Sequence, residues 1–371
     1  MKRSAGTAVF VGAGMPFEAR EYPIVDPAPG MAVVRLVSSG ICGTDVHIWE
    51  GAIPFSGPMI LGHEFLGRVA DLGDAGTQAK DCLGSPIAPG DLVAVNVIEP
   101  CGACALCRTG GAASCLHLME SLTYTRSPEE PPHLHGGFAE ATICPIRYLH
   151  RLPDGLPPDV AAAFLCAGPT IVRAMQYGGG IQAGEHVVIQ GSGPVGMFAA
   201  LWASRHGTGT VTLIGSSSHP RRLTLALRLG AAETLDIRST TTEERCSRIM
   251  AITDGVGANV VVECSGSPHA VAEGLALLRP RGRYLLAGQY SDRGPVPVPA
   301  HVITFNALQV LGSAQFTAQD RQDYFDFMLR VEDVWATVAE VITHRYPVAA
   351  ANDALQTVRA GAAIKALLVP E

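Results

Sequence analysis

Charged and aromatic side chains are both scarce in this 371-residue chain, at 16% and 6% of the sequence. Lysine and arginine (27) are outnumbered by aspartate and glutamate (34), which leaves a net charge of −7. This balance argues against a nucleic-acid partner, because binding to a phosphate backbone depends on clustered positive charge. Hydrophobic residues make up 47% of the chain, enough for a large folded core.

Long apolar runs are also missing. No segment reaches the roughly 18 uninterrupted apolar residues of a membrane span. The first residues, Met1-Lys2-Arg3, lead into small residues rather than into the apolar core of a signal peptide. We therefore expect a cytoplasmic protein without a membrane partner. At a prior of about 150 residues per domain, the length predicts two domains.

The sequence pattern changes near Val160. Before it, short β-branched runs at 31–37 and 91–95, bounded by Gly and Pro, are typical of a small barrel or sandwich. After it, helical stretches alternate with continuous apolar runs, which are typical of parallel strands buried on both faces. These runs lie at 186–190, 210–214, 259–264 and 283–287. The pattern predicts a doubly wound α/β domain, followed by helices over 319–331, 334–342 and 352–360 and a strand over 363–369.

A glycine fingerprint follows the first of these runs. The segment Gly191-Ser192-Gly193-Pro194-Val195-Gly196 matches G-x-G-x-x-G between a predicted strand and a predicted helix. Gly191 would allow a tight turn, Gly193 the approach of a pyrophosphate to the helix N-terminus, and Gly196 close packing of helix on strand. The alternative is an ordinary glycine-rich turn, but the flanking pattern favours a dinucleotide site.

The acidic residue that usually holds the ribose 2′-OH, about 20 residues further on, is missing. The strand at 211–214 runs instead into a segment with small hydroxyls, including Ser216 and Ser217, and with Arg221 and Arg222. These groups could bind a 2′-phosphate, which favours NADP(H) over NAD. The alternative is that both arginines are solvated at the start of the next helix and that NAD is accepted through the serines.

Four cysteines with the spacing C-x2-C-x2-C-x7-C are concentrated in one short segment. Cys101, Cys104, Cys107 and Cys115 could close a tetrahedral all-sulfur site for Zn²⁺, with no position left for a substrate. Such a zinc site is structural and would supply part of the folding energy of its lobe. An iron–sulfur ligand set and free thiols are the alternatives.

Three further residues of metal-binding type are dispersed along the chain. Cys42, His63 and Cys166 could form a site of two thiolates and one imidazole with one coordination position free, the arrangement of a catalytic zinc. Taken singly, each has a plainer interpretation, since a buried Cys usually packs in a core and an isolated His is usually a turn or core residue.

In combination and in this order, the segments resemble the zinc-containing alcohol dehydrogenases of the medium-chain dehydrogenase/reductase superfamily, over nearly the whole chain. The shared motifs are Gly40-x-Cys42-Gly43-Thr44-Asp45-x-His47, Gly62-His63-Glu64-x-x-Gly67-x-Val69, the four-cysteine lobe, Gly136-Gly137-Phe138-Ala139-Glu140, Cys166-Ala167-Gly168-x-Thr170 and the glycine fingerprint.

The resemblance implies a two-domain α/β fold. A distorted β-barrel catalytic domain, similar to GroES, would comprise residues 1–158 and 314–371, with a structural-zinc lobe at about 96–118. A Rossmann domain with a doubly wound parallel sheet would comprise residues 159–313. Dimers and tetramers are usual in such families, so we expect a homo-oligomer.

The resemblance also implies residue roles. Cys42, His63 and Cys166 would bind the catalytic zinc, and Glu64 would be the nearby carboxylate that can enter or replace a ligand. Asp45 would orient His63. Thr44 and His47 would relay the alcohol proton through the nicotinamide ribose to solvent.

The implied activity is zinc-dependent interconversion of an alcohol with an aldehyde or ketone by hydride transfer to or from NAD(P). A polyol, sugar-alcohol or amino-alcohol dehydrogenase on the same fold is the near alternative. A non-catalytic protein that binds zinc and nucleotide is the alternative of a different class.

Overall fold

The computed structural model describes residues 3–73 and 79–371. Met1 and Lys2, part of the N-terminal segment considered in the sequence analysis, therefore lie outside the described residues. The chain forms two compact units. Unit 1 consists of Met1–Cys166, Thr317–Glu332 and Ile342–Glu371, and unit 2 of Ala167–Phe316 and Asp333–Val341.

The expected domain division stays a prediction, and the compact units depart from it at residues 159–166, 314–316 and 333–341. Residues 159–166 belong to unit 1 because they pack on its own helix. The Tyr324 hydroxyl, fully buried, donates hydrogen bonds to the carbonyls of Val160 and Ala161 at 3.3 and 2.9 Å.

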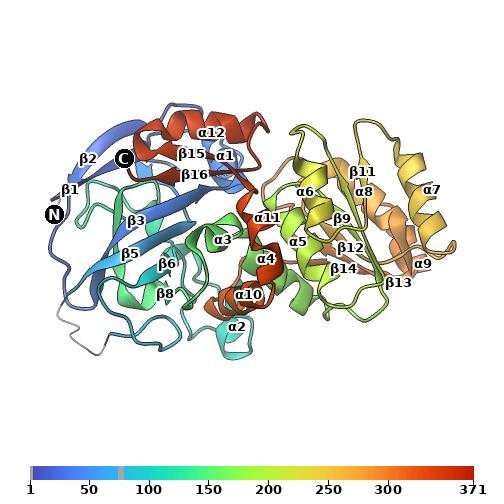
Figure 1. Cartoon of the computed structure of the whole chain (residues 1–371), viewed down its shortest axis with the longest axis horizontal. Helices are drawn as coiled ribbons and strands as arrows, with labels where there is room; N and C mark the ends of the chain where they lie inside the picture. The colour runs from blue at the N-terminus through green and yellow to red at the C-terminus, as the bar shows by residue number, and fades with distance from the viewer. Residues whose placement is uncertain (1–2, 74–78) are drawn as a thin grey trace. The chain divides into compact units, whose positions relative to one another are not determined.

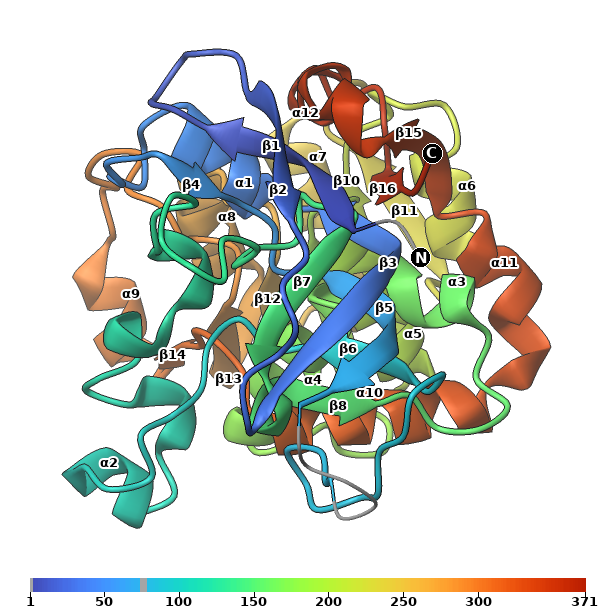
Figure 2. The same cartoon turned by 90° about the vertical axis from the view of Figure 1, so that its left-hand side faces the viewer.

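Unit 1 is built on the long strand β3 (Met31–Ile41), which pairs antiparallel with three strands. One edge of β3 pairs with β5, while its other edge pairs first with β7 and then with β16 (Figure 2). Register shifts along the β3–β5 ladder mark bulges, which bend strands and help a sheet to curve. The order of the sheet is β15-β16-β3-β5-β6-β8, and its other strands are β5 (Phe65–Leu72), β6 (Leu92–Val95), β7 (Ala141–Pro145), β8 (Leu149–Arg151), β15 (Ile342–Pro347) and β16 (Lys365–Val369).

A second, three-stranded sheet and several helices complete unit 1. The sheet has the order β2-β1-β4, with β1 (Ser4–Phe10), β2 (Glu18–Pro23) and β4 (Met59–Ile60). The helices are α1 (Gly43–Trp49), α2 (Ala105–Arg108), α3 (Pro158–Ala163), α10 (Ala318–Arg330) and α12 (Ala351–Arg359), and the short 3₁₀ turns are η2 (Ala112–Ser114), η3 (Met119–Ser121), η4 (Thr123–Thr125), η5 (Ile146–Tyr148) and η7 (Val348–Ala350).

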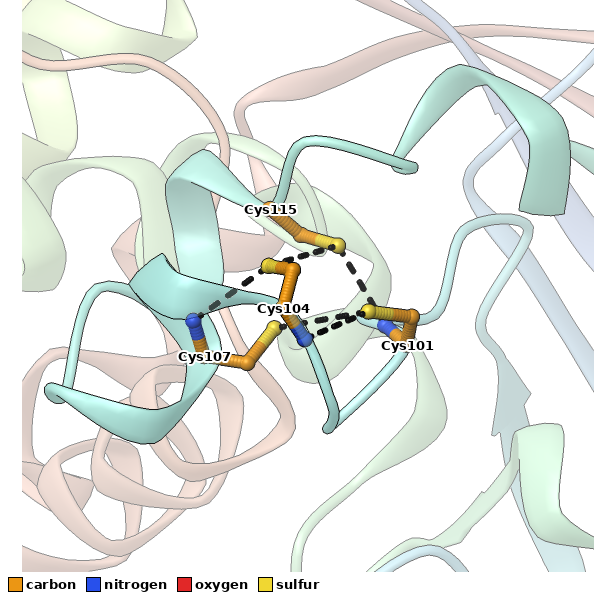
Figure 3. Close-up of side chains that lie close together, drawn as sticks. All are labelled: Cys101, Cys104, Cys107 and Cys115. Carbon is orange, nitrogen blue, oxygen red and sulfur yellow. Dashed lines mark hydrogen bonds between the residues drawn. The ribbon is translucent and has the colours of Figure 1, made fainter.

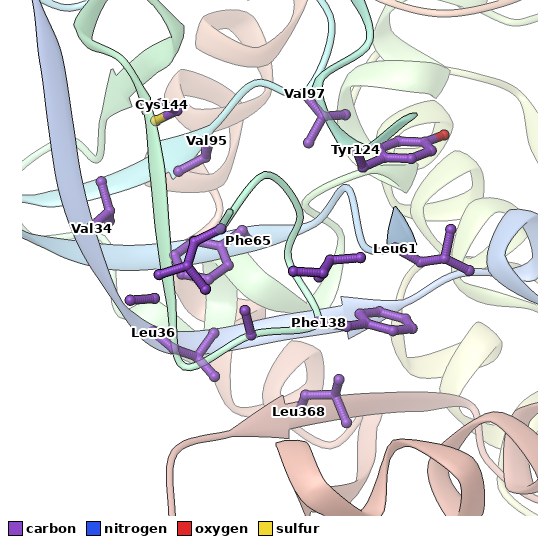
Figure 4. Close-up of a cluster of buried hydrophobic side chains, with 14 of the residues drawn as sticks. Val34, Leu36, Leu61, Phe65, Val95, Val97, Tyr124, Phe138, Cys144 and Leu368 are labelled. Atoms are coloured by element: carbon purple, nitrogen blue, oxygen red, sulfur yellow. The ribbon is translucent and has the colours of Figure 1, made fainter. Parts of the chain in front are cut away.

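Apolar side chains from the N-terminal and C-terminal segments of unit 1 meet in one core. Phe65 and Phe138 are almost fully buried, and Leu368 of the C-terminal strand packs into the same cluster (Figure 4). The last strand is therefore held by the N-terminal part of the chain, although more than 200 residues separate them. This closure places the C-terminal strand β16 beside Cys42 and Gly40, since Ala366 and Leu367 pair with Ile41 and Gly40.

Unit 2 contains a six-stranded, fully parallel sheet in the order β11-β10-β9-β12-β13-β14 (Figure 1). This order reverses direction between β9 and β12, as in doubly wound dinucleotide-binding folds. The strands are β9 (His186–Gln190), β10 (Thr210–Gly215), β11 (Glu233–Asp236), β12 (Ala258–Glu263), β13 (Leu278–Leu286) and β14 (Gln309–Gly312). The helices are α4 (Ala167–Tyr177), α5 (Pro194–Ser204), α6 (Arg222–Arg228), α7 (Thr242–Ile252), α8 (Pro268–Leu277), α9 (Ala300–Phe305) and α11 (Trp335–Ala339), and η6 (Glu332–Val334) precedes α11.

The expected doubly wound sheet is therefore confirmed. The strands β9, β10 and β12 lie within one residue of the predicted runs, because a buried parallel strand is a continuous apolar run in the sequence. The predicted helix over 334–342 was too long. The structure ends α11 at Ala339 and starts β15 at Ile342, so the apolar residues at 341–342 belong to a turn and a strand.

Candidate active site and cofactor site

Cys42, His63, Glu64 and Cys166 converge within unit 1, and one ligand atom from each lies within 4.8 Å of all the others. Cys42 follows β3 and directly precedes α1, while His63 and Glu64 lie between β4 and β5. The structure thus brings together the three side chains predicted to form an open metal site. The donor set of two sulfurs and one imidazole suits Zn²⁺.

The local hydrogen bonds orient these groups. The Asp45 carboxylate accepts a hydrogen bond from the Cys42 backbone N–H at 2.8 Å, which fixes the start of α1. Its other oxygen lies 3.5 Å from Nδ1 of His63, and both atoms are buried without a closer partner in the described chain. Asp45 therefore lies where a carboxylate can orient a metal-binding imidazole.

The surroundings of the site favour a thiolate at Cys42, whereas the hydrogen bond with Cys42 and burial raise the pKa of Cys166 well above its ordinary value. Hydrogen bonds from Cys166 and His63 to Cys42, together with the charge of Lys365, outweigh burial and hold the pKa of Cys42 well below its ordinary value. Burial alone would lower the pKa of His63, but Asp45 and Cys42 raise it well above the ordinary value. A buried thiolate surrounded by donors is the form in which cysteine binds a metal.

Behind this cluster lies an ion pair that the sequence did not reveal. Lys365 on β16 donates to Glu64 Oε2 at 2.5 Å, and both side chains are almost completely buried. Burial raises the pKa of Glu64 and the lysine opposes part of that rise, while Glu64 raises the pKa of Lys365 and keeps it protonated. A Cβ atom at position 40 would lie 2.7 Å from Lys365 Nζ and would also collide with the Glu64 carboxylate, so Gly40 makes room for the pair.

The predicted relay residues share helix α1. Thr44 Oγ1 lies 3.7 Å from Cys42 Sγ, and His47 follows three residues later, on the same face of the helix. Both side chains are partly exposed. Partial exposure thus leaves both side chains in contact with solvent, and Thr44 also lies beside Cys42.

The four-cysteine lobe also forms a compact cluster (Figure 3). Sγ atoms of Cys101 and Cys107 are 4.0 Å apart, and those of Cys104 and Cys115 are 3.9 Å apart. These separations are too long for disulfides and close to the roughly 3.8 Å that tetrahedral zinc with 2.3 Å Zn–S bonds requires.

Backbone N–H groups surround the sulfur atoms of this lobe. Cys101 Sγ accepts from Ala103 and Cys104 at 3.4 and 3.3 Å, and Cys104 Sγ accepts from Cys107 at 3.5 Å. These hydrogen bonds lower the pKa of Cys104 to about 6 and also lower that of Cys101. Desolvation and hydrogen bonds with Cys104 and Cys115 instead raise the pKa of Cys107 to about 12, so the loop stabilises thiolate charge at Cys101 and Cys104, which a bound cation would partly compensate.

In unit 2 the glycine fingerprint has the geometry expected of a dinucleotide site. Gly191 has a φ of +121°, Gly193 precedes α5, and Pro194 occupies the first turn of that helix. A Cβ at position 196 would collide with the Gly191 carbonyl, so Gly196 is needed for the close turn. Around Gly193 there is space for a phosphate, because a Cβ at that position would meet no atom nearer than one on Arg222, 3.9 Å away.

The structure separates the two arginines that follow β10. Arg222 Nη1 donates to the carbonyl of Ser192 at 3.1 Å, inside the fingerprint, and the Ser192 hydroxyl donates to the carbonyl of Ser216 at 3.0 Å. Arg221 instead lies 3.9 Å from the Glu340 carboxylate. The Ser217 N–H donates to Asp236 at 3.2 Å. Arg222 and Ser216 therefore lie against the fingerprint, whereas Ser217 contacts Asp236 at the end of β11 and Arg221 faces Glu340.

Comparison with known proteins agrees with both halves of the structure. Residues 28–154 match the family described as "Alcohol dehydrogenase GroES-like domain", and residues 194–330 match "Zinc-binding dehydrogenase". The 5-exo-hydroxycamphor dehydrogenase of Pseudomonas putida is 35% identical over 355 residues, 95% of each chain. The sorbitol dehydrogenase of Halalkalibacterium halodurans is 30% identical over 358 residues, 95% of this chain and 96% of that protein.

Solved structures agree as well. An alcohol dehydrogenase of Thermotoga maritima superposes with a TM-score of 0.91 at 32% identity, covering 99% of this chain and 100% of that one. A structure described as a zinc-binding dehydrogenase of Sinorhizobium meliloti 1021, bound to NADP, has a TM-score of 0.79 at 27% identity, with 99% of both chains covered.

A GroES-like part joined to a doubly wound nucleotide-binding sheet, with clustered thiols and an imidazole, defines a two-domain zinc-dependent dehydrogenase. The chain belongs to the zinc-containing alcohol dehydrogenase family of the medium-chain dehydrogenase/reductase superfamily. It is an oxidoreductase that acts on CH–OH donors with zinc and NAD(P) as cofactors, which confirms the fold, enzyme class and cofactors expected from the sequence. Among residues 3–73 and 79–371, no helix is long and apolar enough to cross a membrane.

The ion pair behind the metal cluster leads to a stability prediction. Replacing Lys365 by Met leaves the Glu64 carboxylate buried and unpaired, so the free energy of unfolding should fall by about 3–5 kcal/mol, measured by urea denaturation near pH 7. Because removal of the lysine raises the pKa of Glu64 further in the folded state, the loss should shrink as the pH is lowered and the carboxyl becomes protonated.

The double variant Lys365→Met/Glu64→Gln is the control. It removes both charges and should recover much of the lost stability. Equal destabilisation of the single and double variants would show that lost packing, and not the unpaired carboxylate, is responsible.

Proposed function

We propose that Cys42, His63 and Cys166 bind the zinc ion at which this enzyme interconverts an alcohol with an aldehyde or ketone. The convergence of their ligand atoms within 4.8 Å, from segments far apart in the sequence, is the observation that supports the assignment. Asp45 orients His63, and the Glu64–Lys365 pair keeps a further carboxylate next to the site.

When bound, zinc supplies a Lewis acid and NAD(P) a hydride acceptor or donor. The chain's own residues handle the proton. Thr44 Oγ1, beside Cys42, accepts the proton of an alcohol, and His47 passes it to solvent. An imidazole suits this last transfer, since its ordinary pKa of about 6.5 allows it to gain and lose a proton near neutral pH.

For the substrate we propose an alcohol with an apolar body. Phe55 and Tyr124 form an edge-to-face pair with ring centroids 6.3 Å apart, and Tyr124 belongs to the same buried cluster as Leu61, in the segment that leads to His63 (Figure 4). The 35% identical relative is named for 5-exo-hydroxycamphor, a compact apolar alcohol. Polyols and amino alcohols, suggested by the relatives named for sorbitol and L-threonine, are the other outcomes of a substrate test.

For the 2′ end of the cofactor we propose NADP(H), bound by Arg222 with Ser216 and Ser217. Arg222 lies against the fingerprint loop, whereas the charge of Arg221 is partly neutralised by Glu340. The solved S. meliloti relative binds NADP. Arg221 then adds long-range positive charge rather than a direct contact.

We further propose that the four-cysteine lobe holds a second, structural zinc ion. We also propose that the protein works as a homo-oligomer in the cytoplasm. None of the ten cysteines, all of which are described in the structure, forms a disulfide, which suits a reducing compartment. Strand β14 ends the unit 2 sheet, and near it Phe305 is 89% and Val310 38% exposed. An exposed apolar sheet edge favours pairing with a second copy.

The catalytic assignment is tested with the zinc-loaded whole chain, a panel of apolar secondary alcohols, polyols and amino alcohols, and both cofactors. We expect turnover of the apolar alcohols. Cys42→Ser and His63→Ala should reduce kcat by at least about 10³-fold, because the Lewis acid is lost, while the dissociation constant of the reduced cofactor stays within about twofold. Turnover near wild type in either variant would overturn the zinc assignment.

Removal of one lobe thiol should act on stability and not on specificity. In Cys104→Ser we expect the zinc content to fall to about half and the thermal midpoint to drop by several degrees, while the order of preferred substrates is unchanged. Elemental analysis and thermal denaturation measure both effects. A fully stable variant that retains two metal ions per chain would contradict a structural zinc.

The two arginines provide a matched pair for cofactor preference. Arg222→Ala should raise the KM for NADP⁺ by about tenfold or more and leave that for NAD⁺ within about threefold, since only NADP⁺ carries the 2′-phosphate. Arg221→Ala should have a smaller effect, and salt should diminish it. If both variants leave the NADP⁺/NAD⁺ ratio unchanged, Arg222 does not recognise the 2′-phosphate.

A further inference from the structure

A buried carboxylate in unit 2 has no role in the chemistry described so far. Glu263 is the last residue of β12 and has no exposed surface. It lies beside the point where the strand order of the sheet reverses, next to β9 and the glycine fingerprint. Burying a carboxylate costs free energy unless it is hydrogen-bonded, so the partners of Glu263 indicate why it is buried.

One oxygen of Glu263 holds the loop that follows β12. Glu263 Oε1 accepts three hydrogen bonds: from the Ser265 N–H at 2.7 Å, the Ser265 hydroxyl at 2.6 Å and the Gly266 N–H at 2.9 Å. The carboxylate therefore satisfies consecutive backbone donors of the loop, as an anion does in a backbone nest.

The same residue also holds the loop that follows β13. The backbone carbonyl of Glu263 accepts from the N–H groups of Ala287 and Gly288 at 3.0 and 2.9 Å. Gln289 then closes the two loops together, because its side-chain amide donates to the carbonyl of Ser267 at 2.9 Å. Glu263 is thus the common anchor of two loops at the carboxyl ends of adjacent parallel strands.

These two loops pack directly against the glycine fingerprint. A Cβ at Gly191 would lie 2.9 Å from the carbonyl carbon of Cys264 and 3.0 Å from the Ser265 nitrogen. A Cβ at Gly288 would lie 2.7 Å from both Glu263 Oε2 and the Gly266 nitrogen. Three backbones meet around one carboxylate, at the edge of the sheet where dinucleotides bind in doubly wound folds.

The surroundings of the second carboxylate oxygen of Glu263 indicate that this residue does more than stabilise the fold. Oε2 is buried and has no hydrogen-bond partner among the described residues. An unsatisfied buried acceptor costs stability, and a short neutral side chain could cap the loop without that cost. Local features that reduce stability are expected where function benefits from them.

We propose that Glu263 is a positioning residue for cofactor binding: its carboxylate pre-organises the loop 264–267 against the fingerprint glycine, and that loop in turn receives the side chain of Gln289 from the loop 287–289, so that the NAD(P) site is formed before the cofactor arrives. The proposal concerns the ordering of the cofactor site and does not depend on the substrate or on the zinc assignment.

Direct titration of the whole chain with NADH and NADPH, followed by fluorescence, tests this proposal. Glu263→Gln keeps the shape but loses the charge, and it should weaken binding of the preferred cofactor by about tenfold. Glu263→Ala should weaken it further. Because the loops position the cofactor and do not react with it, kcat at saturating cofactor should change by less than about threefold.

A readout without cofactor separates pre-organisation from other effects. Hydrogen exchange of peptides covering 264–267 should accelerate in both Glu263 variants, since local opening of this loop becomes easier, and exchange over 287–289 should accelerate less, because backbone hydrogen bonds to the Glu263 carbonyl remain. Ser265→Ala, which removes one of the three donors, should shift binding and exchange in the same direction by a smaller factor. If Glu263→Ala fails to fold, the variants Ser265→Ala and Glu263→Gln are sufficient for the test.

The matched control is Glu273→Gln in the same unit. Glu273 is a largely, but not completely, buried carboxylate that pairs with Arg245 at 2.6 Å between helices α7 and α8. This variant should leave the cofactor dissociation constant within about twofold even if it lowers the thermal midpoint. Unchanged cofactor affinity in both Glu263 variants would overturn the proposal, and so would an equal loss of affinity in Glu273→Gln.

Discussion

Two cysteine thiolates, an imidazole and a carboxylate cannot share a protein interior unless positive charge compensates the anions. In this chain the four groups lie within 4.8 Å of one another, and Lys365 supplies one buried positive charge to Glu64. The remaining thiolate charge calls for a cation between Cys42, His63 and Cys166. The sheet of unit 1, closed by the C-terminal strand, is what keeps these groups in place.

Close approach of backbones recurs at each functional part of the molecule. Gly40 leaves space for the buried ion pair, and Gly191 and Gly288 let three loops meet around Glu263. In the four-cysteine lobe, backbone N–H groups approach the sulfur atoms instead. In all three places the fold arranges main-chain donors or small residues around an anionic side chain, so that charge is stabilised before any ligand binds.

The sequence predicted most of what depends on local pattern. The strand–glycine–helix segment, the cysteine spacing and the continuous apolar strands each carry their information within about 20 residues. The Glu64–Lys365 pair could not be found this way, because its partners are 301 residues apart. A charged residue inside the apolar run 363–369 was the one available signal. The different surroundings of Arg221 and Arg222 also depend on tertiary contacts, with Glu340 and Ser192.

Anomalous diffraction at the zinc edge, from crystals of the whole zinc-loaded chain, tests the central claim most directly. The account predicts two peaks of comparable height. One should lie among Cys42, His63 and Cys166 with a non-protein ligand completing its coordination, and the other at the centre of the four-cysteine lobe. An anomalous peak in the four-cysteine lobe, with no anomalous density among Cys42, His63 and Cys166, would contradict the account.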